Sequence, residues 1–204
     1  NLEEFSKFTV TDEDLRKSEQ YKSIGKFNES KNQSNYNKHD FLKHINLTPT
    51  LLNIDDSSIA RAAQLSQKTN QFNLRSKRYS EIDIKRFIND DSLDCCICSA
   101  EDDFGDHGQI GMFIVKYNHA ESSAFLDTFL LSCRILGRDI EMWMMQSLLE
   151  KLQKNNISFL EIEYIPSERN SMVKGFVDKC ALSYNDKLDI ESMPDLVSIP
   201  TNIS

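Results

Sequence analysis

The chain has 204 residues, of which 39% are hydrophobic and 27% are charged, and its formal net charge is −8. That length is sufficient for one sizeable domain with its own hydrophobic core. The excess of acidic side chains argues against binding to nucleic acid or to an anionic membrane surface, because phosphate groups attract lysine and arginine.

The cysteines and the apolar residues indicate a cellular compartment. The five cysteines are odd in number, the sequence has no apolar leader of the signal-peptide kind, and no apolar run is long enough to span a bilayer. A cytoplasmic location is therefore expected. The sequence begins at Asn1, in a polar stretch and without methionine, which suggests a fragment of a longer protein.

Helices are expected in the first quarter of the chain. Thr11 followed by three acidic residues is typical of a helix start and predicts a helix over about 11–30. The string FLKHINL predicts a short helix over 41–47. We interpret 1–55 as a helical linker from an upstream domain, and 56–204 as the folded domain.

The remainder alternates between helix and strand patterns. Apolar residues recur at Ile140, Met144 and Leu148 with the period of a helix packed on one side. The pattern predicts an α/β (or α+β) fold with a central mixed sheet flanked by helices. The expected elements are a helix to about 68, a strand over 71–74, a helix over 81–88, strands over 94–100, 110–117 and 124–133, a helix from 140, a strand over 159–165, a helix over 171–180, and one or two short strands in the tail.

Two strings carry a family resemblance. RAAQLSQKTNQFNLRSKRY, at 61–79, and SCRILGRDIE, at 132–141, resemble the carboxy-terminal half of the FkbH-like proteins of haloacid dehalogenase (HAD) superfamily subfamily IIIC. In those proteins a phosphatase-type HAD domain precedes an acetyltransferase-like domain. The resemblance covers roughly 5–185 and implies the linker and a GNAT-like (Gcn5-related acetyltransferase) domain. The Asp-x-Asp-x-Thr string of the phosphatase does not occur, so that chemistry is expected in an upstream domain.

The string SCRILGRD joins a strand end to a helix start, where backbone N–H groups are expected to face outward. Arg134 and Arg138 would add two cations. Gcn5-related acetyltransferases hold the diphosphate of coenzyme A with a loop whose first two conserved positions resemble Arg134 and Gly137. Asp139 departs from the third position, where a carboxylate would repel a diphosphate or cap the helix. A cofactor-binding loop and a capped helix start both remain open.

Cys133 is the candidate catalytic nucleophile. A helix dipole and Arg134 would stabilise its thiolate. The alternative is a small buried residue at the end of an apolar strand. The resemblance implies that a glyceryl group passes from a phosphorylated glycerate to a carrier-protein thiol through an enzyme thioester, and Cys133 lies in the family's SCR motif. We therefore expect Cys133 to be the transient acyl carrier.

Two other groups suggest ligands but have simpler interpretations. Cys95, Cys96 and Cys98 lack a second ligand pair, so no metal site is expected, and strand alternation places Cys95 on the face opposite the other two. The acidic string EDDFGDHG, at 101–108, fits a tight turn between strands better than a calcium loop. His107 within it is a minor catalytic candidate.

The string TNQFNL, at 69–74, is polar where a strand would bury its side chains. Buried amides must find hydrogen-bond partners, which favours a shaped polar pocket, although the first two residues could simply end the preceding helix. The side chains expected to line this pocket are Thr69, Asn70, Gln71 and Asn73.

Two later residues bear on a cofactor. Asn170 opens the helix after the fifth strand and would contact a pantetheine arm or cap that helix, and capping is favoured. Acetyltransferases often place a tyrosine general acid where this chain has Val177, which disfavours amine acetylation.

Three functions follow. The first is an acyl-handling domain that delivers a glyceryl-type three-carbon unit to the phosphopantetheine thiol of an acyl carrier protein. The second is a non-catalytic module that docks the carrier, and the third is an N-acyltransferase that uses acetyl-coenzyme A. The expected partners are the carrier and the upstream HAD-type domain, without nucleic acid or membrane. An acidic carrier requires a local basic surface, for which the candidates are Arg134, Arg138, Lys77 and Arg78.

Overall fold

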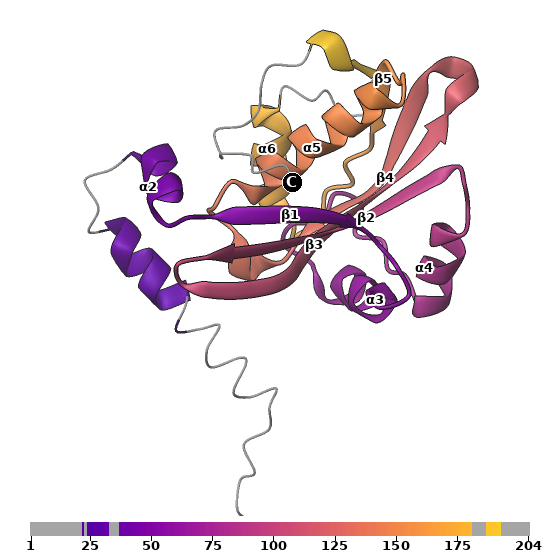
Figure 1. The fold of residues 1–204 in the computed structure, drawn as a ribbon. Coiled ribbons are helices and arrows are strands. Elements are labelled where there is room, and N and C mark those ends of the chain that lie inside the picture. Colours follow the sequence, from indigo (N-terminus) through magenta and orange to yellow (C-terminus); the bar gives the residue numbers. More distant parts are fainter. Residues whose placement is uncertain (1–21, 23, 33–36, 181–186, 193–204) are drawn as a thin grey trace, which may run out of the picture.

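The computed structural model describes residues 22, 24–32, 37–180 and 187–192, and a six-stranded mixed sheet forms its centre (Figure 1). The strands lie in sequence order across the sheet. Neighbours are antiparallel except β4 and β5, which are parallel. The strands are β1 (Thr48–Asn53), β2 (Leu93–Asp102), β3 (Gly105–Asn118), β4 (Ser123–Leu131), β5 (Phe159–Ile162) and β6 (Lys187–Asp189).

Helices cover both faces of this sheet. One face packs against α3 (Ile59–Lys68) and α4 (Glu81–Ile88), and the other against α5 (Ile140–Lys154) and α6 (Ser171–Lys179) (Figure 1). The order is one strand, two helices, three strands, a helix, a strand, a helix and a strand. The predicted α/β fold, with a central mixed sheet flanked by helices, is confirmed.

Strand alternation divides the core into two layers. In β2, Cys96 and Cys98 pack in the layer beneath α5 and α6, whereas Cys95 and Ile97 pack in the layer beneath α3 and α4. Successive side chains of a strand point to opposite faces, so a strand buried on both sides must be apolar throughout. The predicted separation of Cys95 from its two neighbours is confirmed.

The first strand was predicted in the wrong place. Residues 71–74 form only an isolated bridge, between Asn73 and Leu130, and the first strand is β1, which pairs with β2 along six residues. Most side chains of β1 are exposed or half-buried, so its sequence lacks the apolar alternation that identifies a strand. β1 lies before the boundary expected at residue 55, and the division into linker and domain stays a prediction.

The amino-terminal helices agree with the expected pattern where the structure describes them. The short helix expected over 41–47 is α2 (Lys38–His44), whose N-cap Asn37 accepts a hydrogen bond from the N–H of Asp40 at 3.0 Å. Residues 24–32 are helical, in agreement with the end of the helix expected over 11–30. The rest of that helix lies almost wholly outside the described residues. No helix in the described part is long and apolar enough to cross a membrane.

Candidate active site

The two parallel strands of the sheet separate partway along β4. β4 pairs with β5 only over Ser123–Leu126. On its other side β4 keeps its pairing with β3, but the register shifts so that Asp127 has no partner. Such a bulge bends a strand and changes its direction. Beyond it, 128–131 carry backbone groups that β5 does not reach.

A segment from the preceding connection occupies this edge of β4. We call residues 69–74 the edge segment. The N–H of Leu74 donates to the carbonyl of Phe129 at 3.1 Å, and the N–H of Leu131 donates to the carbonyl of Phe72 at 3.0 Å. On the opposite side, the N–H of Ile165 donates to the carbonyl of Leu74 at 3.0 Å. The edge segment therefore bridges β4 and the chain that follows β5.

Two buried asparagines hold the edge segment in place. Asn170, which is 0% exposed, donates from Nδ2 to the carbonyls of Asn73 and Ile165, both at 3.0 Å, and its Oδ1 accepts from the N–H of Ser167 at 2.7 Å. Asn73, which is 1% exposed, accepts from the N–H of Ser76 at 2.9 Å. Asn170 makes no side-chain capping bond, so the favoured capping role is wrong. A pantetheine arm would reach this amide only by replacing one of these bonds.

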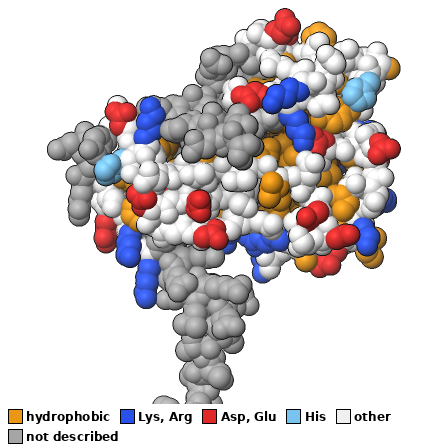
Figure 2. Space-filling model, viewed as in Figure 1, with side chains coloured by type: hydrophobic (Ala, Val, Ile, Leu, Met, Phe, Trp, Pro, Cys, Tyr) orange, Lys and Arg blue, Asp and Glu red, His pale blue; other side chains and the backbone are white. Residues whose placement is uncertain are grey.

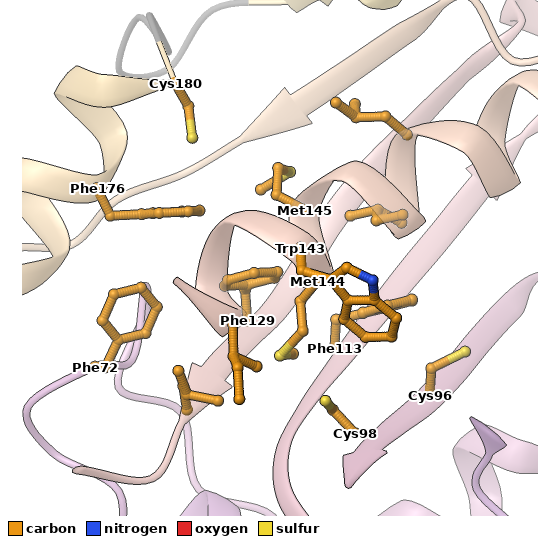
Figure 3. Close-up of a cluster of buried hydrophobic side chains, with 14 of the residues drawn as sticks. Phe72, Cys96, Cys98, Phe113, Phe129, Trp143, Met144, Met145, Phe176 and Cys180 are labelled. Carbon is orange, nitrogen blue, oxygen red and sulfur yellow. The ribbon is translucent and has the colours of Figure 1, made fainter. Parts of the chain in front are cut away.

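Three phenylalanine rings pack together where the edge segment meets β4 and α6. The rings of Phe129 and Phe176 are stacked, with centroids 5.4 Å apart, and Phe72 meets Phe176 edge-on at 5.3 Å (Figure 3). Burial of a phenylalanine side chain stabilises a protein by roughly 1.5–3 kcal/mol. The edge segment is thus anchored by its aromatic side chain as well as by its backbone.

The four residues predicted to line a polar pocket lie in different surroundings. Thr69 and Asn73 are buried, Asn70 is half-buried and accepts a hydrogen bond from Arg78, and Gln71 is exposed. The side-chain amide of Asn73 accepts a hydrogen bond from the backbone of Ser76. The polarity of the edge segment therefore reflects backbone and side-chain bonds within the fold, at least for Asn73 and Asn70.

The loop after β4 contains two residues with left-handed backbone conformations. Gly137 and Asp139 both adopt left-handed conformations, with φ values of 89° and 56°. The N–H groups of Gly137 and Ile140 donate to no acceptor among the described residues. Neighbouring free N–H groups at the start of a helix attract oxyanions. Asp139 stands at the N-cap of α5 but makes no capping bond, so its predicted capping alternative is wrong.

Arg138 points into the protein, not outward as predicted. Its side chain is 1% exposed, its Nε donates to Oδ2 of Asp102 at 2.9 Å, and its guanidinium lies 3.7 Å from the ring centre of Phe27. Nε2 of His107 is 3.0 Å from the other carboxylate oxygen of Asp102. Burial alone would raise the pKa of Asp102, but His107 and Arg138 outweigh it and lower that pKa. The Arg138 side chain and the His107 ring therefore both contact Asp102 inside the protein.

Arg134 turns back toward β3. Its Nη2 donates to the carbonyls of His107 and Gln109 at 2.8 and 3.1 Å. Burial lowers the pKa of Arg134, and the nearby charges of Cys133 and Asp106 oppose that change. The side chain is half-buried and therefore still accessible to a ligand.

Cys133 differs from every other cysteine of the chain. It lies in a single turn of 3₁₀ helix, Cys133–Ile135, and is exposed, so the alternative of a buried structural residue is wrong. Figure 3 shows three of the other cysteines among apolar side chains. Burial raises the pKa of each buried thiol, to about 12 in three cases, and so disfavours the thiolate. The buried thiols are Cys95, Cys96, Cys98 and Cys180.

A tight turn joins β2 and β3 as predicted, but it comprises only Asp103 and Phe104, and the rest of the acidic string lies in the two strands. Gly105 and Gly108 have positive φ values of 131° and 60°, and Oδ1 of Asp106 accepts from the N–H of Gly108 at 2.6 Å. Within the described ranges, no three His, Cys, Asp or Glu side chains are grouped so that they could hold a metal ion. Acidic and basic side chains are interspersed on the face drawn in Figure 2.

Neither protein-family models nor curated proteins match the chain. Solved structures with a similar arrangement include two N-acetyltransferases and Ard1. The ribosomal-protein-S18-alanine N-acetyltransferase of Escherichia coli shares 11% identity at a TM-score of 0.48, over 64% of this chain and 75% of that one. Spermidine N-acetyltransferase of Vibrio cholerae, in complex with CoA and spermine, shares 15% at 0.45, over 57% and 72%. Ard1 of Thermoplasma volcanium shares 10% at 0.48, over 64% and 80%. Similarity at this level carries no argument about activity.

The loop after β4 offers free N–H groups to a diphosphate, but the adjacent strand edge does not fit the arm of coenzyme A. A diphosphate bound at Gly137 and Ile140 would direct the amide-bearing arm back along β4, since a strand edge offers the backbone groups that such an arm can pair with. Phe72 and Leu74 already take those positions on β4. The described residues therefore do not fit a coenzyme A arm lying along β4.

Proposed function

We propose that this domain handles acyl groups through Cys133, accepting a glyceryl-type three-carbon unit as a thioester and delivering it to the phosphopantetheine thiol of an acyl carrier protein. The observation that carries the proposal is that Cys133 is the one exposed thiol among five, beside Arg134 and a loop with free N–H groups. An exposed thiol is accessible to an acyl donor, whereas a buried one is not.

The proposed transfer is a pair of thiol–acyl exchanges. The thiolate of Cys133 attacks the carbonyl carbon of the acyl donor and forms a C–S bond, while the bond to the donor's leaving group breaks and that group takes up a proton. The carrier's thiol then loses its proton and attacks the same carbon, which restores the Cys133 thiolate. Neither step requires an oxidant or a reductant.

The closed edge of β4 supports delivery to a carrier. Cys133 lies beyond the last residue of β4 and is exposed, so a thiol on a long arm can reach it without displacing Phe72 from the edge of β4. The upstream HAD-type domain, the acidic carrier and the cytoplasmic location are parts of the same proposal that rest on the sequence resemblance and composition.

A second candidate is N-acylation with acetyl-coenzyme A, which the free N–H groups of Gly137 and Ile140 favour. Two features oppose it: the occupied edge of β4, and Val177, which is buried in α6 where a general-acid tyrosine is common. Calorimetric titration with acetyl-coenzyme A tests this candidate, and clear binding would revive it. The non-catalytic docking module is the outcome if Cys133 proves unreactive.

A glyceryl thioester of N-acetylcysteamine serves as acyl donor in the direct test. Mass spectrometry of the intact protein should show one added glyceryl group on the wild type and on Cys180→Ala, the buried-thiol control, but none on Cys133→Ala. A label that persists on Cys133→Ala would sink the proposal. Release of that label by a phosphopantetheine-bearing carrier, with glyceryl appearing on the carrier, tests the second exchange.

A further inference from the structure

Two arginines from distant parts of the chain meet beside Cys133. Nε and Nη2 of Arg61, on α3, donate to the backbone carbonyl of Gln109 at 3.1 and 2.7 Å. Nη2 of Arg134 donates to the same oxygen at 3.1 Å. Because two of these nitrogens share one acceptor, the guanidinium groups of Arg61 and Arg134 lie within about 6 Å of each other.

These donors exceed what the shared acceptor can satisfy. A carbonyl oxygen has two lone pairs, and three N–H groups are directed at that of Gln109. Nε of Arg134 is buried and has no hydrogen-bond partner. A buried donor without an acceptor is costly, and such groups in native proteins call for a ligand or another explanation.

Neither arginine has an acidic partner within ion-pair distance among the described residues. Asp106 acts on Arg134 only from farther away. Burial, together with the charge of Arg134, lowers the pKa of Arg61 to about 10. Like charges held close together in a half-buried site repel each other. Among the described residues, no acidic side chain within ion-pair distance offsets this repulsion between Arg61 and Arg134.

Cys133 is the immediate sequence neighbour of this pair. Cys133 and Arg134 are consecutive residues of the same single turn of 3₁₀ helix, Cys133–Ile135. Cys133 is exposed and both arginines are half-buried, so solvent reaches all three residues.

We propose that Arg61 and Arg134 together form a binding site for an oxyanion, a phosphate or carboxylate, carried by the molecule that reacts at Cys133. This inference rests on the proposed function. Guanidinium groups suit such a ligand because their N–H groups match the spacing of carboxylate and phosphate oxygens. The ligand would take the free donors of both side chains and offset their mutual repulsion.

The alkylation of Cys133 by two reagents tests the site separately from thiol reactivity. Iodoacetate carries a carboxylate and iodoacetamide does not, so the ratio of their rates at Cys133 measures oxyanion recognition, whereas the iodoacetamide rate alone measures the thiol. We expect Arg61→Gln to lower that ratio about tenfold, which corresponds to about 1.4 kcal/mol, and Arg61→Lys to keep part of it. Arg86→Gln, an exposed arginine on α4, is the matched control. An unchanged ratio in Arg61→Gln overturns the inference.

Inorganic phosphate provides a second measurement that does not depend on the cysteine. Titration should shift the Nε–H resonances of Arg61 and Arg134 in the wild type, and should shift that of Arg134 less in Arg61→Gln. Absence of a shift in the wild type would overturn the site even if Cys133 is too slow to alkylate. A slow Cys133 with a clear phosphate shift would instead refute the proposed acyl transfer and leave the site intact.

Competition identifies the source of the oxyanion. Protection of Cys133 from iodoacetate by a phosphorylated glycerate, but not by phosphopantetheine, would place the site on the acyl donor. The reverse result would place it on the arm of the carrier. Protection by neither, at concentrations where inorganic phosphate protects, would contradict a substrate role.

Discussion

Arg134 and Arg138 stand four residues apart in one motif, yet their surroundings are opposite. Arg138 is fully buried, and its charge is matched by Asp102 and covered by Phe27. Arg134 is half-buried, has no ion pair among the described residues, and shares the carbonyl of Gln109 with a second cation. The comparison separates a charge that the fold has neutralised from one that remains able to bind.

A second contrast is between the edge of β4 and the loop that follows it. The edge of β4 before the loop is closed by Phe72 and Leu74, whereas the loop itself keeps free N–H groups at Gly137 and Ile140. Backbone groups on a strand edge invite pairing with another chain or ligand, and here the protein's own chain supplies the pairing. The free N–H groups of Gly137 and Ile140 thus lie beyond the end of β4, in the loop that begins at Cys133.

The largest effect should come from removing the partner of Arg138. Asp102→Asn leaves a guanidinium buried without its counter-charge, and breaking such a pair costs about 3–5 kcal/mol of unfolding free energy. Chemical denaturation measures the loss. Asp91→Asn, at an exposed position, is the control and should stay within about 0.5 kcal/mol of the wild type. Equal stability of Asp102→Asn and Asp91→Asn would contradict the description of Arg138 as a charge that Asp102 neutralises.

Asn170→Ala should weaken the closure of the β4 edge. The change leaves the carbonyls of Asn73 and Ile165 and the N–H of Ser167 without their side-chain partner, which should cost about 1–3 kcal/mol. Hydrogen exchange should become faster at the N–H groups of Leu74 and Leu131, which bond the edge segment to β4.

Gln71→Ala is the control for this edge, because Gln71 lies in the same segment but is exposed. Its exchange rates should match those of the wild type. If Asn170→Ala also left both amides protected, the aromatic cluster alone would account for the closure. If Asn170→Ala then bound coenzyme A while the wild type did not, the occupied edge would be identified as the barrier.

Sequence patterns predicted the elements that pack by a regular period. The helix from Ile140 and the alternation around Cys96 follow directly from apolar spacing, because each buries one defined face. β1 was not predicted because its side chains are mostly exposed. The edge segment was predicted as the first strand, but it forms only an isolated bridge to β4, and its backbone is also held by a distant residue, Asn170. Long-range pairing leaves no local period in a sequence.

The site was predictable at Cys133 but not at its charged neighbours. The burial of Arg138 depends on Asp102, thirty-six positions away, and nothing near either residue signals the pairing. Arg61 stood within the motif at 61–79 but was given no role. One signal could have identified it: no acidic residue lies three or four positions from Arg61, although such spacing is where a surface cation on a helix finds a partner.

Acid should reveal the same buried pair without a mutation. The pKa of Asp102 is lower in the folded protein than in the unfolded chain, so its contribution to stability is present above the unfolded pKa, about 4. That contribution is lost as the pH falls below about 4, through the folded pKa. Denaturation curves between pH 5 and pH 2 should therefore fall less steeply for Asp102→Asn than for the wild type, and parallel curves would contradict the assignment.

The smallest effect on stability is expected for Arg134→Gln. This result tests whether Arg134, unlike Arg138, is dispensable for folding. The change removes two part-buried hydrogen bonds, to the carbonyls of His107 and Gln109, but it also removes the cation that repels Arg61, so the unfolding free energy should change by less than about 1 kcal/mol. Arg138→Gln is the matched substitution in the same motif and should be far more costly, because it leaves Asp102 buried without its ion-pair partner. Equal losses for the two variants would mean that Arg134 is as structural as Arg138, and that the free donors beside Cys133 serve the fold and not a ligand.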